Sequence, residues 1–545
     1  MVGEGVARPL PGAAPFLSMG SSTQTVFVRP GAFEARPAFF LSFGLAILAF
    51  ALYAATCSPF VGSEDVAEFQ ALAASHGIAH AGYPLYLLAL EAFYRLPFMT
   101  APWRANLVSA LAAAVAVGLF AAIAIRYTQS RIAAAAAACA IALSYSLWHD
   151  ATRAEIYAFT LALSAGALFS FLHYLDTRSV DPLALCCVLV GLSLTAHLSS
   201  LALAAVIAVA LLADVVRGRA PLHHLAVAAG AVAVGLLPLL LIPLRDVPGD
   251  SMNYIAFTFD EHSGRHIPWS PAIATRLRRA ALLLSGAQYL EGGRFHPFQD
   301  ALARVRLVGW NLALNDLPGL GLLLAAAGGV AALLRRRVLD VLLLAWLGGL
   351  TLLFLYAAYP MSATSFFLPG VWILALFVAR AVSLVRARAW PAALVLALAL
   401  AAAPWARLRL ADPPAPFTRS SAAAAWKAWP AGWNPFSPDP SWEKFGRGVL
   451  AALPRRAHVL ACWEEGTTLL ALQKALRIRP DVAIHLSCDS PGRIRSVIDS
   501  ARRGGSGVYA TIPPRRLPAP GEWTAVAAGP HGGLWRRRER PADPR

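Results

Sequence analysis

Acidic side chains and histidines are concentrated in one short stretch, residues 62–86, which follows a long uncharged run almost at once. Glu64, Asp65 and Glu68 lie within five residues of one another, and His80 follows them. Charge beside a bilayer is costly, so a cluster of it indicates a function or a set of partners. On a helix Asp65 and Glu68 would share a face, where a carboxylate can act as a general base or orient an acceptor hydroxyl. The alternative is a group of acidic residues that only stabilises the first turn of a helix behind Ser63.

His76 and His80 are four residues apart, a spacing that allows metal binding on a helix. Gly77 separates them and no third ligand is evident, so no metal is indicated and we expect no cofactor. His80 is instead expected to hydrogen-bond within the loop or to contact a phosphate. Tyr83 belongs to a Gly-Tyr-Pro turn that closes the stretch.

A second polar group, at 148–157, joins two apolar runs and contains His149, Asp150, Arg153 and Glu155. These side chains either pair with one another at a solvated loop or contribute to a site. In a site, Arg153 would hold a lipid phosphate, because a guanidinium binds phosphate in a bidentate way.

Two further features of the sequence could serve either packing or function. His197 stands between two apolar runs, where a histidine is usually a packing residue. The segment 245–306 is long, polar and aromatic, which suits a lid or a wall that faces a sugar. Its prominent residues are Arg245, Asp246, Asp250, Asp260, Glu261, His262, Trp269, Gln288 and Tyr289.

The composition predicts an α-helical polytopic membrane protein. Of 545 residues, 58% are hydrophobic and only 14% are charged, against about 25% charged in soluble domains. The net charge of +17 is typical of cytoplasmic loops and lipid headgroups, and no nucleic-acid motif accompanies it. The sequence contains no Walker loop, strand-linked GxGxxG, HExxH or GxSxG motif, so nothing supports ATP-driven transport, dinucleotide binding or zinc proteolysis.

The uncharged runs fix a topology. They cover residues 37–57, 105–125, 132–148, 156–174, 182–213, 225–244, 317–334, 341–359, 362–379 and 389–406. The run 182–213 is too long for one span, and two short spans place the arginine-rich loops, including 335–337, on the cytoplasmic side. We therefore predict about eleven transmembrane helices, a cytoplasmic N-terminus and an extracytoplasmic C-terminus, with residues 85–98 as an interfacial or re-entrant helix.

The predicted domains follow from this topology. They are a disordered cytoplasmic tail (1–35), a transmembrane domain (36–406) with external loops at 58–104 and 245–306, a linker (407–440) and a small extracytoplasmic α/β domain (441–545). Within the last, strands are expected at 458–462, 482–487, 507–512 and 523–527, and helices at 465–478 and 492–503. Cys462 and Cys488 end neighbouring strands and could form a disulfide.

Several motifs in order resemble a large bacterial family of multi-spanning proteins related to protein O-mannosyltransferases. The resemblance covers roughly residues 40–310 and the tail motif at 479–482. It is carried by the acidic pair, the sequences GIAH (77–80), GYPLY (82–86), WRANLVS (103–109), AEIY (154–157) and AHL (196–198), and a helix ending in LIPLR (241–245). The chain has Val66 and Ala67 where the family has Ser-Gly, and its His–Gly spacing is one residue shorter. This leaves the principal acid open between Glu64 and Asp65.

The resemblance implies a GT-C glycosyltransferase fold in the plasma (inner) membrane of a bacterium. Such enzymes take a sugar, here mannose-like, from a polyprenyl-phosphate carrier at the external face and use no nucleotide sugar. By this resemblance Asp65 would be the base, Glu68 its support, and Arg104, Arg153 or Arg245 the phosphate ligand, while His80, Tyr83 and His197 shape the pocket. The acceptor would be a protein, a glycan or a lipid. The alternatives are a transporter or flippase for lipid-linked sugars, or a non-catalytic scaffold in envelope glycan assembly.

Overall fold

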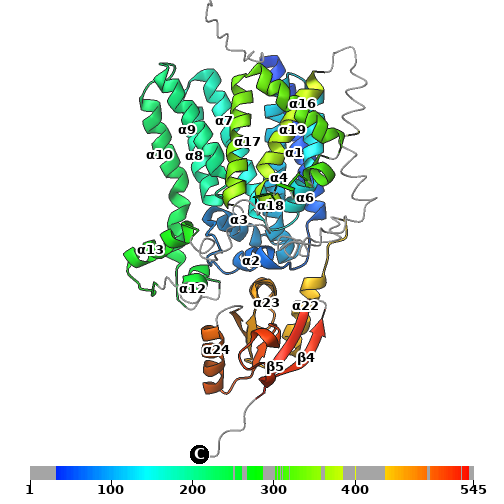
Figure 1. Ribbon diagram of the computed structural model, residues 1–545, viewed down its shortest axis with the longest axis vertical. Coiled ribbons are helices and arrows are strands. Elements are labelled where there is room, and N and C mark those ends of the chain that lie inside the picture. Colours follow the sequence, from blue (N-terminus) through cyan, green and yellow to red (C-terminus); the bar gives the residue numbers. More distant parts are fainter. Residues whose placement is uncertain are drawn as a thin grey trace, which may run out of the picture.

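The chain forms a helical bundle with a small sheet-containing domain below it (Figure 1). This computed structural model describes residues 32–248, 252–259, 267–286, 301–317 except 303–304, 307 and 310, 319–357, 363–384, 399, 436–487, 491–529 and 531–538. Several expected features therefore lie outside the described residues. They are the tail before residue 32, the run 389–406 except residue 399, most of the linker, and Asp250, Asp260, Glu261, His262, Gln288, Tyr289 and Cys488.

Five helices in the described part are long and apolar enough to cross a bilayer. They are α1 (Ala32–Thr56), α4 (Ala101–Thr128), α7 (Ile156–Thr177), α17 (Val338–Ala357), and α10 (His223–Leu236) continued by η1 (Leu237–Leu240) and α11 (Leu241–Arg245). Shorter apolar helices complete the bundle: α3 (Pro84–Tyr94), α8 (Val180–Ala196), α9 (Ser200–Val216), α16 (Leu320–Arg335) and α19 (Leu368–Ser383). Each uncharged run inside the described residues falls on one of these helices or on a bent pair, whereas the total of eleven spans stays a prediction.

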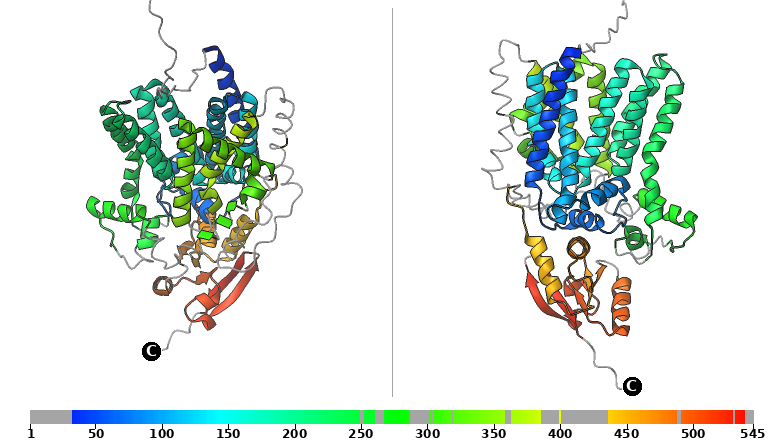
Figure 2. Two further views of the ribbon diagram at one scale, coloured as in Figure 1. Left: turned by 45° about the horizontal axis from the view of Figure 1, so that its top comes forward. Right: turned by 180° about the vertical axis from the view of Figure 1, so that it is seen from behind.

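The remaining helical segments connect or flank the spans. They are α2 (Glu64–Leu72), α5 (Arg131–Ala142), α6 (Tyr145–Ala151), α12 (Tyr254–Phe259), α13 (Ile273–Leu284), the π-helical turn η2 (Leu312–Asp316) and α18 (Ala363–Phe366). In Figures 1 and 2, α2 and α3 cover the end of the bundle that faces the sheet domain.

Two breaks in the apolar runs bring polar residues to this end. The run 182–213 is two helices, as predicted, because His197 is extended (φ −157°, ψ 143°) between α8 and α9. The run 132–148 is not the single straight span that we expected: α5 and α6 meet at a bend of 61°. At this bend Ser144 donates its hydroxyl proton to the carbonyl of Ile141 (2.8 Å), a local bond that competes with helix continuation.

Close helix packing depends on small residues. A Cβ at Gly191 of α8 would lie 2.5 Å from the Val232 carbonyl of α10, and one at Gly235 would lie 2.3 Å from the Val188 carbonyl. Only glycine at both positions lets these backbones touch, as is common where helices associate in membranes.

At the end of the bundle far from the sheet domain, charged side chains form pairs. Arg126 contacts Asp176 between α4 and α7, and Arg178 contacts Asp214 at the end of α9. We call this region the paired end. The arginine triplet 335–337 lies at the same end, where α16 finishes and α17 begins.

The C-terminal domain is an α/β domain, as predicted. Its elements are α22 (Ser441–Ala452), β1 (His458–Ala461), α23 (Trp463–Ala475), β2 (Ala483–Leu486), α24 (Pro491–Arg503), β3 (Val508–Ala510), η5 (Pro514–Arg516), η6 (Pro520–Glu522), β4 (Trp523–Gly529) and β5 (Gly532–Arg537). The sheet order is β2-β1-β3-β5-β4, in which β1 runs parallel to β2 and β3, and β5 is antiparallel to β3 and β4. The predicted elements are present, and α22, β5 and the short 3-10 helices η5 and η6 are additions.

Candidate active site

The acidic stretch forms the start of α2. Ser63 occupies the N-cap position, but its side chain makes no cap hydrogen bond. Glu64 has a left-handed backbone (φ 51°), unusual for a residue with a side chain and often found at functional sites. Asp65 and Glu68 share one face of the helix, as predicted, with side chains 38% and 2% exposed. Asp65 is therefore the accessible carboxylate of the two, and Glu68 is the buried one.

His80 connects the two carboxylates. Its Nδ1 lies 2.6 Å from Oε2 of Glu68, and its backbone N–H donates to the other Glu68 oxygen at 2.9 Å. Its Nε2 faces Oδ2 of Asp65 at 3.7 Å. Burial alone would lower the pKa of His80, but the carboxylates of Asp65 and Glu68 outweigh it and raise the pKa to about 9. At neutral pH the histidine is thus a cation held between two acids.

The turn after His80 is held in place by glycine and by the long loop. Tyr83, the N-cap of α3, is left-handed (φ 48°), and its hydroxyl lies 3.3 Å from Nε2 of His80. Ile78 exchanges backbone hydrogen bonds with Met252 and Tyr254 (2.9 and 3.1 Å). A Cβ at Gly77 would lie 2.4 Å from the Met252 carbonyl, so this position requires glycine.

The segment between α6 and α7 brings Arg153 and Glu155 beside α2. Arg153 lies 3.8 Å from the carboxylate of Glu155 and 2.9 Å from Nδ1 of His149. Two residues of α4 hold this segment: Asn106 accepts the backbone N–H of Ala154 (2.8 Å), and Ser109 accepts that of Glu155 (3.1 Å). Two residues of the motif at 103–109 thus fix the backbone of this segment beside the site.

The acids of this cluster repel one another. Burial, then the charges of Glu464 and Asp65, raise the pKa of Glu64 to about 7 against the opposing effect of Arg153. Burial also raises the pKa of Glu155 to about 8, with contributions from Asp65. Such shifts are characteristic of catalytic clefts, although structural charge networks share them.

The other predicted residues lie at varying distances from this cluster. His197 stacks on Tyr83 (ring centroids 6.4 Å apart) and packs against Tyr157 (5.1 Å), so it belongs to the wall of the site. Arg104 instead donates to the carbonyls at 98 and 99 (both 3.2 Å), which ties it to its own loop. Nothing in these contacts links Arg104 to the acids.

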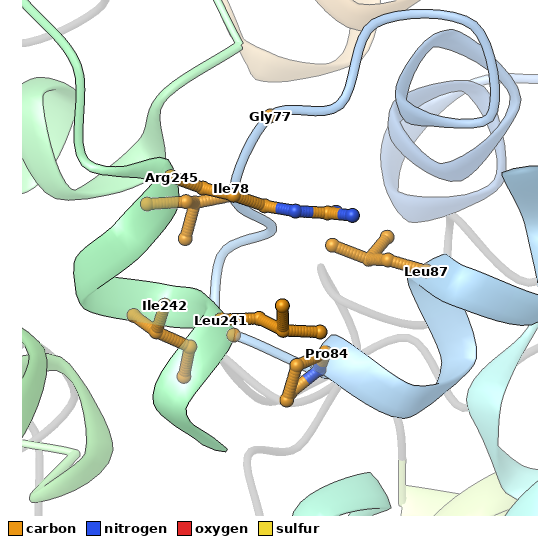
Figure 3. Close-up of a pocket in the computed structure, with 8 residues that line it drawn as sticks. Gly77, Ile78, Pro84, Leu87, Leu241, Ile242 and Arg245 are labelled. Carbon is orange, nitrogen blue, oxygen red and sulfur yellow. The ribbon is translucent and has the colours of Figure 1, made fainter. Parts of the chain in front are cut away.

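Arg245 lies away from this cluster, in a small hollow between α3 and α11 (Figure 3). It forms an ion pair with Glu91 (2.7 Å), which also contacts His76 (2.8 Å). His76 and His80 therefore face different partners and do not form the metal pair that their spacing allows. The apolar lining of the hollow includes Ile78, Pro84, Leu87, Leu241 and Ile242.

A cation could instead be held by Asp65, Glu68 and His80, whose ligand atoms all lie within 4.8 Å of one another. Carboxylate and imidazole suit several divalent metals. Both ring nitrogens of His80 already have protein partners, however: Nδ1 pairs with Glu68, and Nε2 faces Asp65 and the hydroxyl of Tyr83. The three residues thus fit an internal ion pair at least as well as a metal.

Two residues of the site come from the C-terminal domain and were not predicted. Trp463 donates its indole N–H to Oδ1 of Asp65 (3.2 Å), and the charge of Glu464 contributes to the raised pKa of Glu64. The available signal was their place at the start of a helix directly after a strand, where α/β domains often present functional groups. Their separation from α2 in the sequence concealed the contact.

Comparisons with known proteins agree with this architecture. Residues 65–218 match the family model of the protein O-mannosyl-transferase TMEM260 N-terminal domain. Among solved structures, ArnT from Cupriavidus metallidurans in the apo state has a TM-score of 0.53 at 12% identity, covering 92% of this chain and 98% of that one. The same protein bound to undecaprenyl phosphate gives 0.51 at 13% identity, with 93% and 98% covered. No curated protein matches the chain. The resemblance to protein O-mannosyltransferases is therefore confirmed over residues 65–218, and the chain is a multi-pass membrane protein with the GT-C fold of ArnT.

Proposed function

We propose that this protein is a membrane glycosyltransferase that moves a mannose-like sugar from a polyprenyl-phosphate carrier to an acceptor hydroxyl. The observation that carries the proposal is the position of Asp65: an accessible carboxylate beside a buried Glu68–His80 pair, on a GT-C fold. Support for the donor class comes from ArnT, a protein of the same fold that has been crystallised with undecaprenyl phosphate.

Asp65 is the best base among the three acids of α2. Glu68 is almost fully buried and paired with His80. Burial and then the charge of Glu464 raise the pKa of Glu64 to about 7, which leaves it half protonated at neutral pH. Asp65 alone combines exposure with a fixed orientation, because His80 faces one of its oxygens and Trp463 donates to the other.

The reaction that fits this geometry is a single displacement. The acceptor hydroxyl gives its proton to Asp65 as its oxygen attacks the anomeric carbon. The bond from that carbon to the phosphate oxygen breaks, the polyprenyl phosphate leaves with the electron pair, and the configuration inverts. Arg153, 29% exposed beside the acids, is placed to stabilise the charge on the leaving phosphate. Arg245 would contact the carrier at the hollow between α3 and α11.

The distribution of charge supports an external site and an enzyme. The arginine-rich loops lie at the paired end, which the positive-inside rule assigns to the cytoplasm of a bacterial plasma membrane. Asp65 and the C-terminal domain would then be extracytoplasmic. A transporter or flippase would need polar groups along the bundle, whereas the ion pairs Arg126–Asp176 and Arg178–Asp214 gather at the end opposite the site.

The test is transfer by the purified full-length chain in lipid nanodiscs. Radiolabelled polyprenyl-phosphate mannose is the donor, and an envelope extract supplies protein, glycan and lipid acceptors. Asp65→Asn should lower turnover by about 100-fold or more, the usual contribution of a general base. Asp181→Asn, an exposed carboxylate at the start of α8, is the matched control and should keep wild-type turnover. Undiminished transfer in Asp65→Asn would exclude the mechanism, and an inactive wild-type protein would favour a scaffold.

A further inference from the structure

The C-terminal domain is docked on the acidic helix rather than tethered near it. Figures 1 and 2 show α23 directly below α2 in two opposite views. Apolar residues of both sides, including Val66 and Leu469, belong to one buried cluster. Thr468 of α23 donates to the carbonyl of Gly62 (2.9 Å), so the backbone at the start of α2 is held from below.

A second set of bonds fixes the angle of the domain. Glu443 of α22 accepts the backbone N–H of Val61 (2.9 Å). Tyr94, at the end of α3, donates to the carbonyl of Ala475, the last residue of α23 (3.3 Å). The two ends of the contact are thus fixed, and the first turn of α23 can adopt only a narrow range of positions against Asp65.

The indole of Trp463 is itself oriented by aromatic neighbours. Its ring is nearly perpendicular to that of Tyr254 (88°, centroids 5.4 Å apart) and to that of His80 (85°, 6.2 Å). Edge-to-face contacts of this kind define ring orientation. The carboxylate of Asp65 therefore has its Oδ1 held by the C-terminal domain and its Oδ2 facing His80 of the membrane domain.

We propose that α23 is part of the reaction centre, with Trp463 as a positioning residue for Asp65. This inference rests on the proposed function. Sugar transfer then requires the docked C-terminal domain, and the acceptor hydroxyl reaches Asp65 at the junction of the two domains.

The positioning role is tested by Trp463→Phe, which keeps an aromatic ring and removes the N–H donor. With radiolabelled polyprenyl-phosphate mannose, kcat should fall about tenfold while KM for the donor stays within about twofold, the pattern of an interaction needed in the transition state. Trp523→Phe is the matched control, because its indole donates to the carbonyl of Pro518 (3.1 Å) away from α2. Wild-type kcat in Trp463→Phe, in a preparation where Asp65→Asn is inactive, would overturn the positioning role and leave the proposed function intact.

Discussion

At the paired end of the bundle, Asp176 and Asp214 each have one arginine against them. At the other end, Glu64, Asp65 and Glu155 surround a single arginine, Arg153. At the paired end, each of these two carboxylates is neutralised by its arginine, so neither is available for a reaction. At the second end, burial and the neighbouring carboxylates raise the pKa values of Glu64 and Glu155, and Asp65 stays accessible. The same residue types thus serve packing in one region and are arranged for chemistry in the other.

The largest expected difference between the two regions concerns activity. Glu68→Gln removes the counter-ion of His80, so the imidazolium loses the contact that directs it at Asp65. Turnover with the polyprenyl-phosphate donor should fall about 100-fold. Asp214→Asn at the paired end should keep turnover within about twofold and cost about 1 kcal/mol of stability at most, since Arg178 is 34% exposed. Similar turnover in both variants would show that the two ends of the bundle do not differ in their importance for activity.

A smaller effect is expected on stability as pH changes. The pKa values of Glu64 (about 7), Glu155 (about 8) and His80 (about 9) all lie above their ordinary values. Each group therefore stabilises the folded state most at low pH, and this stability is lost as pH rises through about 7 to 9. The melting temperature of the detergent-solubilised chain should fall by several degrees between pH 6 and pH 9, measured by intrinsic fluorescence. A flat or rising profile would contradict the shifts at the site.

The smallest effect is expected from metal removal. If the excess charge near Asp65 is balanced by His80 and Arg153, EDTA should change turnover by less than about twofold. Loss of activity with EDTA, restored by Mn²⁺ or Mg²⁺, would identify Asp65, Glu68 and His80 as a cation site. The same experiment on Glu68→Gln would show whether that residue is a ligand.

Much of the structure could be predicted from local patterns in the sequence. The acidic stretch, the break at His197 and the strands and helices of the C-terminal domain all follow from spacing and composition, which act over a few residues. The bend between α5 and α6 was not predicted, because a serine such as Ser144 is common within an apolar run. Only its hydrogen bond to the carbonyl of Ile141 distinguishes it. The strand β5 was not predicted, because Gly532 and Gly533 have low strand propensity. Its pairing with β3 and β4 outweighs that preference.

The site was less accessible to prediction where it depends on distant contacts. The sequence offered Arg104 and Arg245 as phosphate ligands besides Arg153, although arginines at span ends often only extend towards the lipid headgroups. In the structure Arg104 is bound to its own loop and Arg245 to Glu91. Trp463 and Glu464 could not be connected to α2 without the packing of two domains. Spacing indicates which residues share a helix face, whereas tertiary packing decides which faces meet.

The hydrogen bond between Trp463 and Asp65 joins residues 398 positions apart. A ribosome must therefore synthesise more than four fifths of the chain before the carboxylate in the first loop acquires its partner. During translation, Asp65 therefore lacks its hydrogen bond to Trp463 until α23 has been synthesised. Any fragment that stops before α23 contains the acidic motif but lacks this contact, so the order of synthesis itself delays assembly of the reaction centre until the protein is nearly finished.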